Sequence, residues 1–83
     1  MIKVRILTPE WSREFETDAI FLPGELGEFE VLVNHAPIIS LLNPGNIRWR
    51  TVDEKGVTSE ESLSVNGGVV RVNENHLQIC VEI

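Results

Sequence analysis

Hydrophobic and polar residues alternate with a period of two along most of this 83-residue chain. The first such run contains Ile2, Val4 and Ile6, with Lys3 and Arg5 between them. A period of two turns one side of an extended segment toward a core and the other toward water, so the run predicts a half-buried β-strand. The same pattern predicts further strands within residues 13–18, 28–33, 47–50, 57–65, 70–72 and 77–83.

Two short apolar runs, residues 19–22 and 38–42, lack this alternation. In the second run, Ile38, Leu41 and Leu42 would also share one face of a helix. Prolines at positions 37 and 44 bracket that run and leave too few residues for a stable helix. We therefore interpret both runs as strands, and the second as a buried one.

Glycine and proline separate these runs. Glycine takes a positive φ at no steric cost, and proline pushes the preceding residue out of the helical region. At residues 66–68 the pattern allows either a chain reversal or a bulge, and residues 53–56 predict a hairpin turn with its glycine in the left-handed region. We expect structural turns at five glycines: Gly24, Gly27, Gly45, Gly67 and Gly68.

The spacing of these runs predicts an all-β fold. About nine to ten short strands, with turns between nearly all of them and no helix long enough to name, indicate an antiparallel β-sandwich or flattened barrel. Eighty-three residues suffice for one domain, which must place nearly all of its apolar residues in one core. We expect a single domain over residues 1–83.

Composition narrows the range of partners. The formal net charge is −6, and the seven Lys and Arg residues are scattered, so the clustered cations that bind nucleic acid or anionic lipid are missing. No apolar run approaches the ~18 residues that span a bilayer, and the N-terminus lacks the apolar core of a signal peptide. We expect protein partners, no nucleic acid and no membrane insertion, although docking onto a membrane complex stays open. Cys80 is the single cysteine, which excludes an intramolecular disulfide.

Patterns typical of catalysis or metal binding are missing. His35 and His76 are 41 positions apart, far from the spacings that direct two histidines at one metal. A small enzyme of the cupin type would need a histidine cluster and a carboxylate on facing strands. No serine stands in a nucleophile elbow, and no glycine-rich loop leads into a helix that could hold phosphate. We expect no metal, no cofactor and no catalytic residue.

Glu25, Glu28 and Glu30 admit two readings. They could be paired carboxylates for acid–base chemistry, or wet positions on a turn and strand that give a loop an acidic rim, which is the commoner case. Trp11 and Trp49 could be exposed contacts. A domain with two Trp, three Phe and no Tyr more often needs them inside, and we expect Trp49 in the core.

Residues 27–45, GEFEVLVNHAPIISLLNPG, closely resemble a segment commonly like GEFGVLPNHAPLLSALKPG in the epsilon subunit of F-type ATP synthases. Residues 63–72, LSVNGGVVRV, resemble the later AVSGGFVEV-type stretch of that family, in the same order. With the opening strand and residues 8–10, the resemblance covers essentially the whole chain. Glu30 stands where glycine is usual, Val33 where proline is frequent, and Asn66 where serine is usual.

The resemblance implies the N-terminal β-sandwich domain of that subunit, built of two five-stranded sheets. In the family this domain is a non-catalytic rotor part at the foot of the central stalk. It binds the gamma subunit with one face, rests on the c ring with one end, and couples proton translocation to ATP synthesis. The chain would be peripheral, on the cytoplasmic face of the bacterial inner membrane. The family's C-terminal helices, which inhibit ATP hydrolysis and in some members bind ATP, have no counterpart in residues 1–83, so we expect those activities to be missing from this chain.

Carried over residue by residue, the resemblance implies a c-ring contact at Glu28, to which Glu30 adds a second charge. It implies gamma-subunit contacts at Thr8, His35 and Ser40, although His35 could equally be a turn residue bonded to its own backbone. The alternative function is a small β-sandwich adaptor that binds some other protein outside the ATP synthase. An enzyme is a distant third.

Overall fold

The computed structural model describes residues 1–83, which form seven β-strands and no helix. The chain therefore has no helix of the length and hydropathy needed to cross a membrane. The all-β class predicted from alternation is confirmed. The strands are β1 (Ile2–Leu7), β2 (Ser12–Thr17), β3 (Ala19–Gly24), β4 (Gly27–Leu32), β5 (Ile38–Val52), β6 (Thr58–Asn73) and β7 (His76–Val81).

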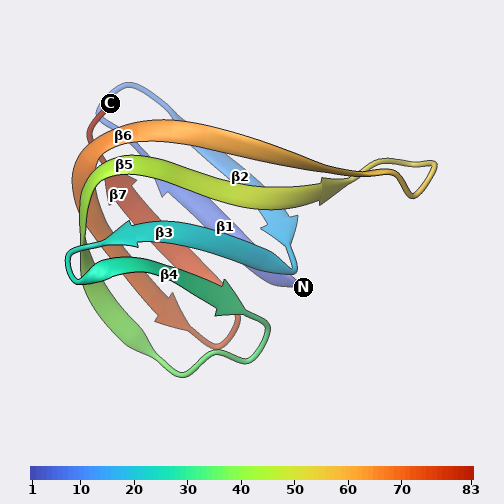
Figure 1. Ribbon diagram of the computed structural model, residues 1–83, viewed down its shortest axis with the longest axis horizontal. Helices are drawn as coiled ribbons and strands as arrows, with labels where there is room; N and C mark the ends of the chain where they lie inside the picture. Colours follow the sequence, from blue (N-terminus) through green and yellow to red (C-terminus); the bar gives the residue numbers. More distant parts are fainter.

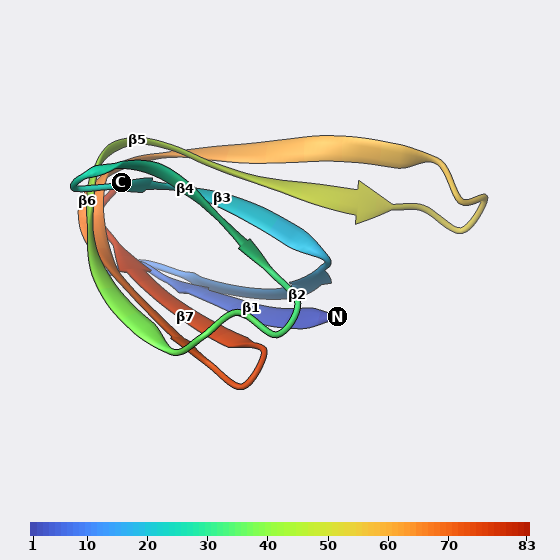
Figure 2. The same cartoon turned by 60° about the horizontal axis from the view of Figure 1, so that its bottom comes forward.

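All seven strands hydrogen-bond into one sheet, in the order β2-β1-β7-β6-β5-β3-β4. Neighbours are antiparallel except β1 and β7, which are parallel. β5 and β6 are long and bent, and they carry the sheet from one layer into the other (Figure 2). We call one half the β3 layer: β4, β3, the later part of β5 and the first part of β6. The other half, the β7 layer, contains β2, β1, β7 and the remaining parts of β5 and β6 (Figure 1).

The expected nine to ten strands and the two separate five-stranded sheets are not observed, because two expected turns lie inside strands. Residues 43–45 lie within β5 and residues 66–68 within β6, and the two strands keep one register over their whole length. The chain bends at these places without reversing. Gly45 is thus not a turn residue. A Cβ added there would lie 2.9 Å from the Pro23 Cβ, so the glycine serves the close approach of β5 to β3.

The expected turn at Gly24 and Gly27 is confirmed. The two glycines face each other across the β3–β4 hairpin, and Glu25 and Leu26 form its tip. Gly27 has a φ of 127°, a conformation that a residue with a side chain rarely adopts. The hairpin can therefore close with two residues at its tip.

The glycine pair at 67 and 68 bends β6 instead of reversing it. Asn66 N–H donates to the Glu82 carbonyl at 2.7 Å, and Glu82 N–H donates to the Gly67 carbonyl at 3.1 Å. A Cβ added to Gly68 would collide with the Cys80 carbonyl oxygen. Glycine at position 68 thus lets the end of β7 lie directly against β6.

The core lies between the two layers. Trp49 is 2% exposed and belongs to it, as expected, whereas Trp11 in the β1–β2 loop is 39% exposed. The buried cluster draws on β1, β3, β4, β5, β6 and β7, so both layers bury one face against the other. Its fifteen members are Ile2, Val4, Ile6, Ile20, Leu22, Val31, Leu42, Ile47, Trp49, Val65, Val70, Val72, Leu77, Ile79 and Val81.

Candidate docking surfaces

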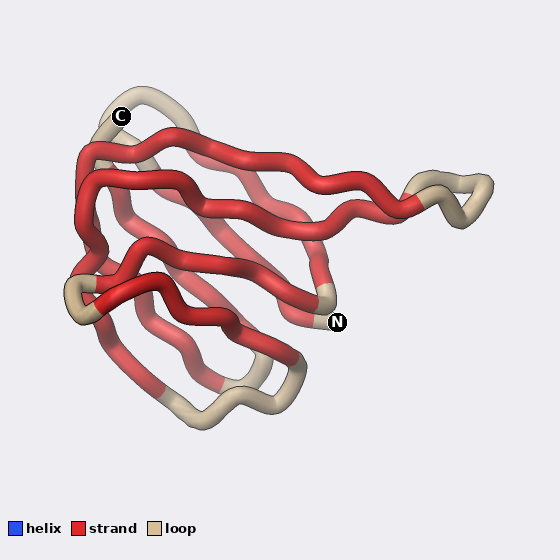
Figure 3. The backbone as a smooth tube through the Cα atoms, viewed as in Figure 1, coloured by secondary structure: helices blue, strands red, loops and turns tan.

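The β3–β4 tip projects at one end of the molecule (Figure 3). Leu26 at this tip is fully exposed, and Glu25 beside it is also exposed. The Glu25 N–H donates to the Leu41 carbonyl at 3.1 Å, which ties the tip to the start of β5. An exposed leucine is therefore carried on a backbone that is held in place.

Glu28 is exposed, as expected, but it lies on β4 next to the tip, and its carboxylate is paired. Arg48 Nη2 donates to Glu28 Oε1 at 2.7 Å, and Arg48 Nη1 lies 3.5 Å from Glu60 Oε1. The Arg48 guanidinium carbon also lies 4.5 Å from the ring centroid of Phe21. The hydrogen bond to Glu28 raises the pKa of Arg48; partial desolvation opposes this, and the charges of Glu28 and Glu60 add to it. Glu28 is thus held over the outer face of β3.

Glu30 and Glu25 differ from Glu28 because neither forms an ion pair. Glu30 stands opposite Phe21 in the β3–β4 register and is exposed. The five ion pairs of the structure include neither carboxylate. Near the tip, two negative charges are therefore free and a third is compensated.

Thr8 shapes the loop between β1 and β2. Its Oγ1 donates to the Trp11 carbonyl at 3.1 Å and accepts from the N–H groups of Glu10 at 3.2 Å and Trp11 at 3.0 Å. These bonds close the loop locally. Thr8 therefore has a structural role in this loop, which lies at the end of β1.

His35 lies in the loop between β4 and β5, and its ring is engaged locally. Its Nδ1 is 2.7 Å from the Ala36 carbonyl, and its N–H donates to the Leu32 carbonyl at 3.2 Å. The reading of His35 as a turn residue bonded to nearby backbone is supported. His76 Nδ1 likewise lies 3.0 Å from the Glu74 carbonyl. No group of three or more histidine, cysteine or acidic side chains is placed to hold a metal ion.

Ser40 lies on the side of β5 that faces the core. It is half-buried and stands opposite the buried Val70 on β6, with its Oγ donating to the Leu41 carbonyl at 3.1 Å. Thr8 lies in the β1–β2 loop, His35 lies in the β4–β5 loop, and Ser40 lies near the start of β5. The structure therefore spreads these three residues over the β7 layer and does not cluster them.

The neighbours of Ser40 in sequence form an exposed apolar surface that sequence reasoning missed. Ile39 and Leu41 point away from the core and are 75% and 57% exposed, so the prediction of a buried strand is wrong for these two residues. The strand register extends this surface into a row across the β7 layer. The row contains Leu41, Val69, Cys80 and Leu7. We call this row, together with Ile39, the apolar row.

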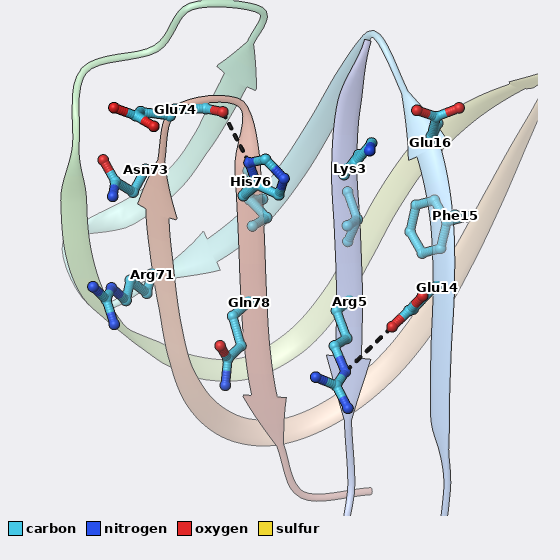
Figure 4. A pocket seen from close by; sticks show the side chains of 12 residues that line it. Lys3, Arg5, Glu14, Phe15, Glu16, Arg71, Asn73, Glu74, His76 and Gln78 are labelled. Atoms are coloured by element: carbon cyan, nitrogen blue, oxygen red, sulfur yellow. Dashed lines mark hydrogen bonds and ion pairs between the residues drawn. The ribbon is translucent and has the colours of Figure 1, made fainter.

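Beside the apolar row, the outer face of the β7 layer bears an open hollow of about 600 Å³ (Figure 4). Three cations, Lys3, Arg5 and Arg71, and three carboxylates, Glu14, Glu16 and Glu74, line it. The Arg5 Nε to Glu14 Oε1 distance is 3.5 Å and both side chains are more than half exposed, so this pair is loose. Lys3 and Arg71 form no ion pair. The outer face thus combines an apolar row with a neighbouring hollow of mixed charge.

The model of one protein family, described as the ATP synthase delta/epsilon chain β-sandwich domain, matches residues 1–83. The chain belongs to this family. Membership of this family accounts for the two-layered all-β fold and for the two segments, residues 27–45 and 63–72, that carry the sequence resemblance. The adaptor alternative gains no support from any comparison.

Named relatives of this delta/epsilon domain are ATP synthase subunits. The "ATP synthase epsilon chain" of a Nitratiruptor species is 42% identical over 83 residues, with 98% of this chain and 60% of that protein covered. The chloroplastic epsilon chain of Chlamydomonas reinhardtii is 40% identical over 82 residues, with 94% of this chain and 57% of that protein covered. The chain therefore spans about 60% of the length of these curated relatives.

Solved structures confirm the fold of the delta/epsilon domain. A chain from the central stalk and c ring of the Tetrahymena thermophila mitochondrial ATP synthase superposes with a TM-score of 0.80 at 22% identity, covering 99% of this chain and 63% of that one. A chain of the Euglena gracilis mitochondrial ATP synthase gives a TM-score of 0.78 at 22% identity, covering 96% and 49%.

Proposed function

We propose that this chain is the β-sandwich part of a non-catalytic rotor subunit in the central stalk of an F-type ATP synthase. The observation that carries the proposal is the family match over every residue, with relatives that are ATP synthase epsilon chains. In this role the domain links the gamma subunit to the c ring and couples proton translocation to ATP synthesis. It is held at the cytoplasmic face of the bacterial inner membrane through the complex, and it uses no cofactor.

The apolar row is the surface we assign to the gamma subunit. Ile39 and Leu41 together offer two large apolar side chains that this chain leaves uncovered. Burying one such side chain fully contributes about 1.5–3 kcal/mol, so covering both supports a specific interface. Thr8 and His35 mark the two ends of this layer, and Ser40 lies beneath it. The three gamma contacts that the family resemblance implies thus border the apolar row and do not form its centre.

The β3–β4 tip is the surface we assign to the c ring. It presents one exposed leucine, and the free charges of Glu25 and Glu30 lie beside it. Glu28 contributes through the ion pair with Arg48, which fixes its carboxylate on β4. A contact with free carboxylates is partly electrostatic and weakens with salt, because the Debye length is ~8 Å at physiological ionic strength.

Binding to the cognate gamma subunit tests the proposal directly. Calorimetry or native mass spectrometry with purified chain and gamma subunit should show a one-to-one complex. A chain that bound neither gamma nor an isolated c ring would contradict the rotor function. Raising the salt concentration should weaken binding to the c ring more than binding to the gamma subunit, because the surface assigned to gamma is centred on the apolar row.

A further inference from the structure

The first half of β6 is an open sheet edge. β6 pairs with β5 along its whole length, but it pairs with β7 only from Gly68 onward. Residues 58–65 therefore have a strand on one side and none on the other. In Figure 2 this part of β6 runs along the border of the β3 layer and continues into the arm that β5 and β6 form beyond the sandwich. We call residues 58–65 the β6 edge.

Hydrogen bonding to β5 shows which peptide groups of the β6 edge are free. The Asp53 N–H donates to the Val57 carbonyl at 3.0 Å, and antiparallel partners exchange such bonds at every second residue. The register of β5 and β6 does not shift, so the alternation that begins at Val57 continues along the strand. The backbone groups of odd-numbered residues of the edge therefore hydrogen-bond to β5. The next even-numbered residue, Asn66, confirms this direction, since its N–H donates away from β5 to Glu82. The outward peptide groups belong to Thr58, Glu60, Ser62 and Ser64.

The β6 edge lacks most of the features that usually block a further strand. It contains no proline and no glycine, and three of its four outward residues have small hydroxyl side chains. Its protection consists of two carboxylates. Glu60 is 54% exposed on the outer face and 3.5 Å from Arg48, while Glu61 points inward to Arg13 at 2.8 Å. Arg50 stands opposite Glu60 on β5, so a cation on an added strand would share the Glu60 carboxylate with arginines, whereas a carboxylate placed there would be repelled by it.

On the inner side of the β6 edge, apolar side chains of an added strand would fit best. Leu63 is half-buried against the core, and Val65 is buried. A residue placed beside them on a neighbouring strand would cover the exposed part of Leu63. Side chains alternate between the two faces of a strand, so a matching segment would alternate basic residues on the outer face with apolar residues on the inner face.

The backbone of the edge is already held in position. At the end of the arm, Asp53 Oδ1 accepts from the N–H groups of Lys55 and Val57, both at 2.9 Å. At its base, Arg50 donates two bonds of 3.0 Å to the Asp18 carboxylate. A preorganised edge loses little conformational entropy when a partner pairs with it, which favours binding.

We propose that the β6 edge binds an extended segment of a partner protein as an added antiparallel strand, and that this segment alternates basic with apolar residues. Main-chain hydrogen bonds would come from the four outward peptide groups, and a lysine or arginine would lie opposite Glu60. The edge is separate from the apolar row and the β3–β4 tip, so the inference does not rest on the proposed function.

The probe is an acetylated and amidated eight-residue peptide that alternates lysine with valine, titrated into the chain by calorimetry. In an antiparallel pair, the residue opposite Glu60 directs its N–H toward β6 and its side chain to the outer face. N-methylation of the lysines should therefore weaken binding about tenfold or more, and N-methylation of the valines should leave it unchanged. A peptide with glutamate in place of lysine should not bind.

Two variants of the chain, and one control variant, locate the site. Ser62→Pro removes an N–H that bonds to no other strand, so the fold should persist while peptide binding weakens about fivefold or more. Ser62→Ala keeps the N–H and should bind like the parent. Glu60→Gln should weaken binding and reduce its dependence on salt.

Thermal unfolding checks that each variant is folded, and amide exchange at residues 58–64 reports protection by the peptide. Three outcomes would overturn the proposal. These are no binding at millimolar peptide, equal loss of binding from both N-methylated peptides, and parent-like binding by a folded Ser62→Pro variant.

Discussion

Phe15 on β2 stacks on Trp49 on β5, with ring centroids 4.5 Å apart and ring planes 21° apart. β2 and β5 are not neighbours in the sheet, so the stack joins the two layers where no ladder connects them. Arg13 lies 5.5 Å and 5.4 Å from the two ring centroids and donates to Glu61 at 2.8 Å. The Trp49 indole donates to the same carboxylate oxygen at 3.1 Å. Side chains therefore close the open side of the folded sheet.

Truncating Phe15 should destabilise the chain more than truncating an exposed aromatic residue. Phe15→Ala is expected to cost about 2 kcal/mol, less than for a fully buried phenylalanine because Phe15 is half-buried. Trp11→Ala is the control and should change the free energy of unfolding by about 0.5 kcal/mol or less. Urea unfolding followed by fluorescence measures both. Equal effects would show that the stack does not join the layers energetically.

Replacing glycine with alanine should lower stability much more at Gly68 than at Gly27. At Gly68 the added Cβ collides with the Cys80 backbone, and backbone cannot move aside as a flexible side chain can, so Gly68→Ala should cost about 3 kcal/mol or more. At Gly27 the space is open and the cost is that of a φ of 127°, about 1–2 kcal/mol. Thermal melts of the two variants compare them. A Gly27→Ala variant less stable than Gly68→Ala would contradict this order.

Removing Arg48 should lower stability by an amount that shrinks with added salt. Arg48→Met leaves Glu28 and Glu60 without their shared cation and uncovers the Phe21 ring. A raised pKa of a basic group gives stability that is present below its unfolded pKa and lost as the pH rises through its folded pKa. Both pKa values lie far above the neutral range, so the titration of Arg48 itself should add no pH dependence between pH 6 and 9. Melting temperatures at low and high salt across that range provide the test.

Polar substitution of the apolar row should weaken gamma binding without unfolding the chain. Ile39→Ser with Leu41→Ser is expected to raise the dissociation constant about 100-fold, since two large apolar contacts are lost. Val52→Ser with Val57→Ser is a matched control, because these valines of the arm are 61% and 58% exposed and lie away from the row. Calorimetry with the gamma subunit separates the two pairs. A similar loss from both would mean that the row is not the gamma surface.

Reversing the free charge at Glu30 should impair coupling at the c ring. Glu30→Lys changes a carboxylate without an ion pair, whereas Glu28→Lys would also break the contact with Arg48. Proton pumping driven by ATP should fall for Glu30→Lys, and fall further when both residues are reversed. If the folded double variant pumped like the parent and bound the ring as tightly, the β3–β4 end would be only a solvated surface.

Period-two alternation located the strands well because it reports which side of an extended segment is buried. It could not show that residues 43–45 and 66–68 bend continuous strands, since glycine and proline indicate backbone freedom but not whether the chain reverses. That outcome depends on pairings between distant residues, such as Pro44 with Asn66. The sequence pattern predicts Ile39 and Leu41 as buried, wrongly, for a related reason. A run that is apolar on both faces looks the same whether its outer face is covered by the chain or by a partner.

The pairing of β1 with β7 sets a condition on how the domain folds during synthesis. Residues Lys3 to Leu7 lie beside His76 to Cys80, so β1 cannot pair with β7 until residues 76–80 have left the ribosome. Until then β1 can pair only with β2, and a two-stranded hairpin is marginally stable in water. Contacts between such distant parts of a chain slow folding, because the long loop between them must close first. We expect nascent chains that stop before residue 76 to leave β1 and β2 open to proteases, and protection of these two strands to appear only after β7 has been synthesised.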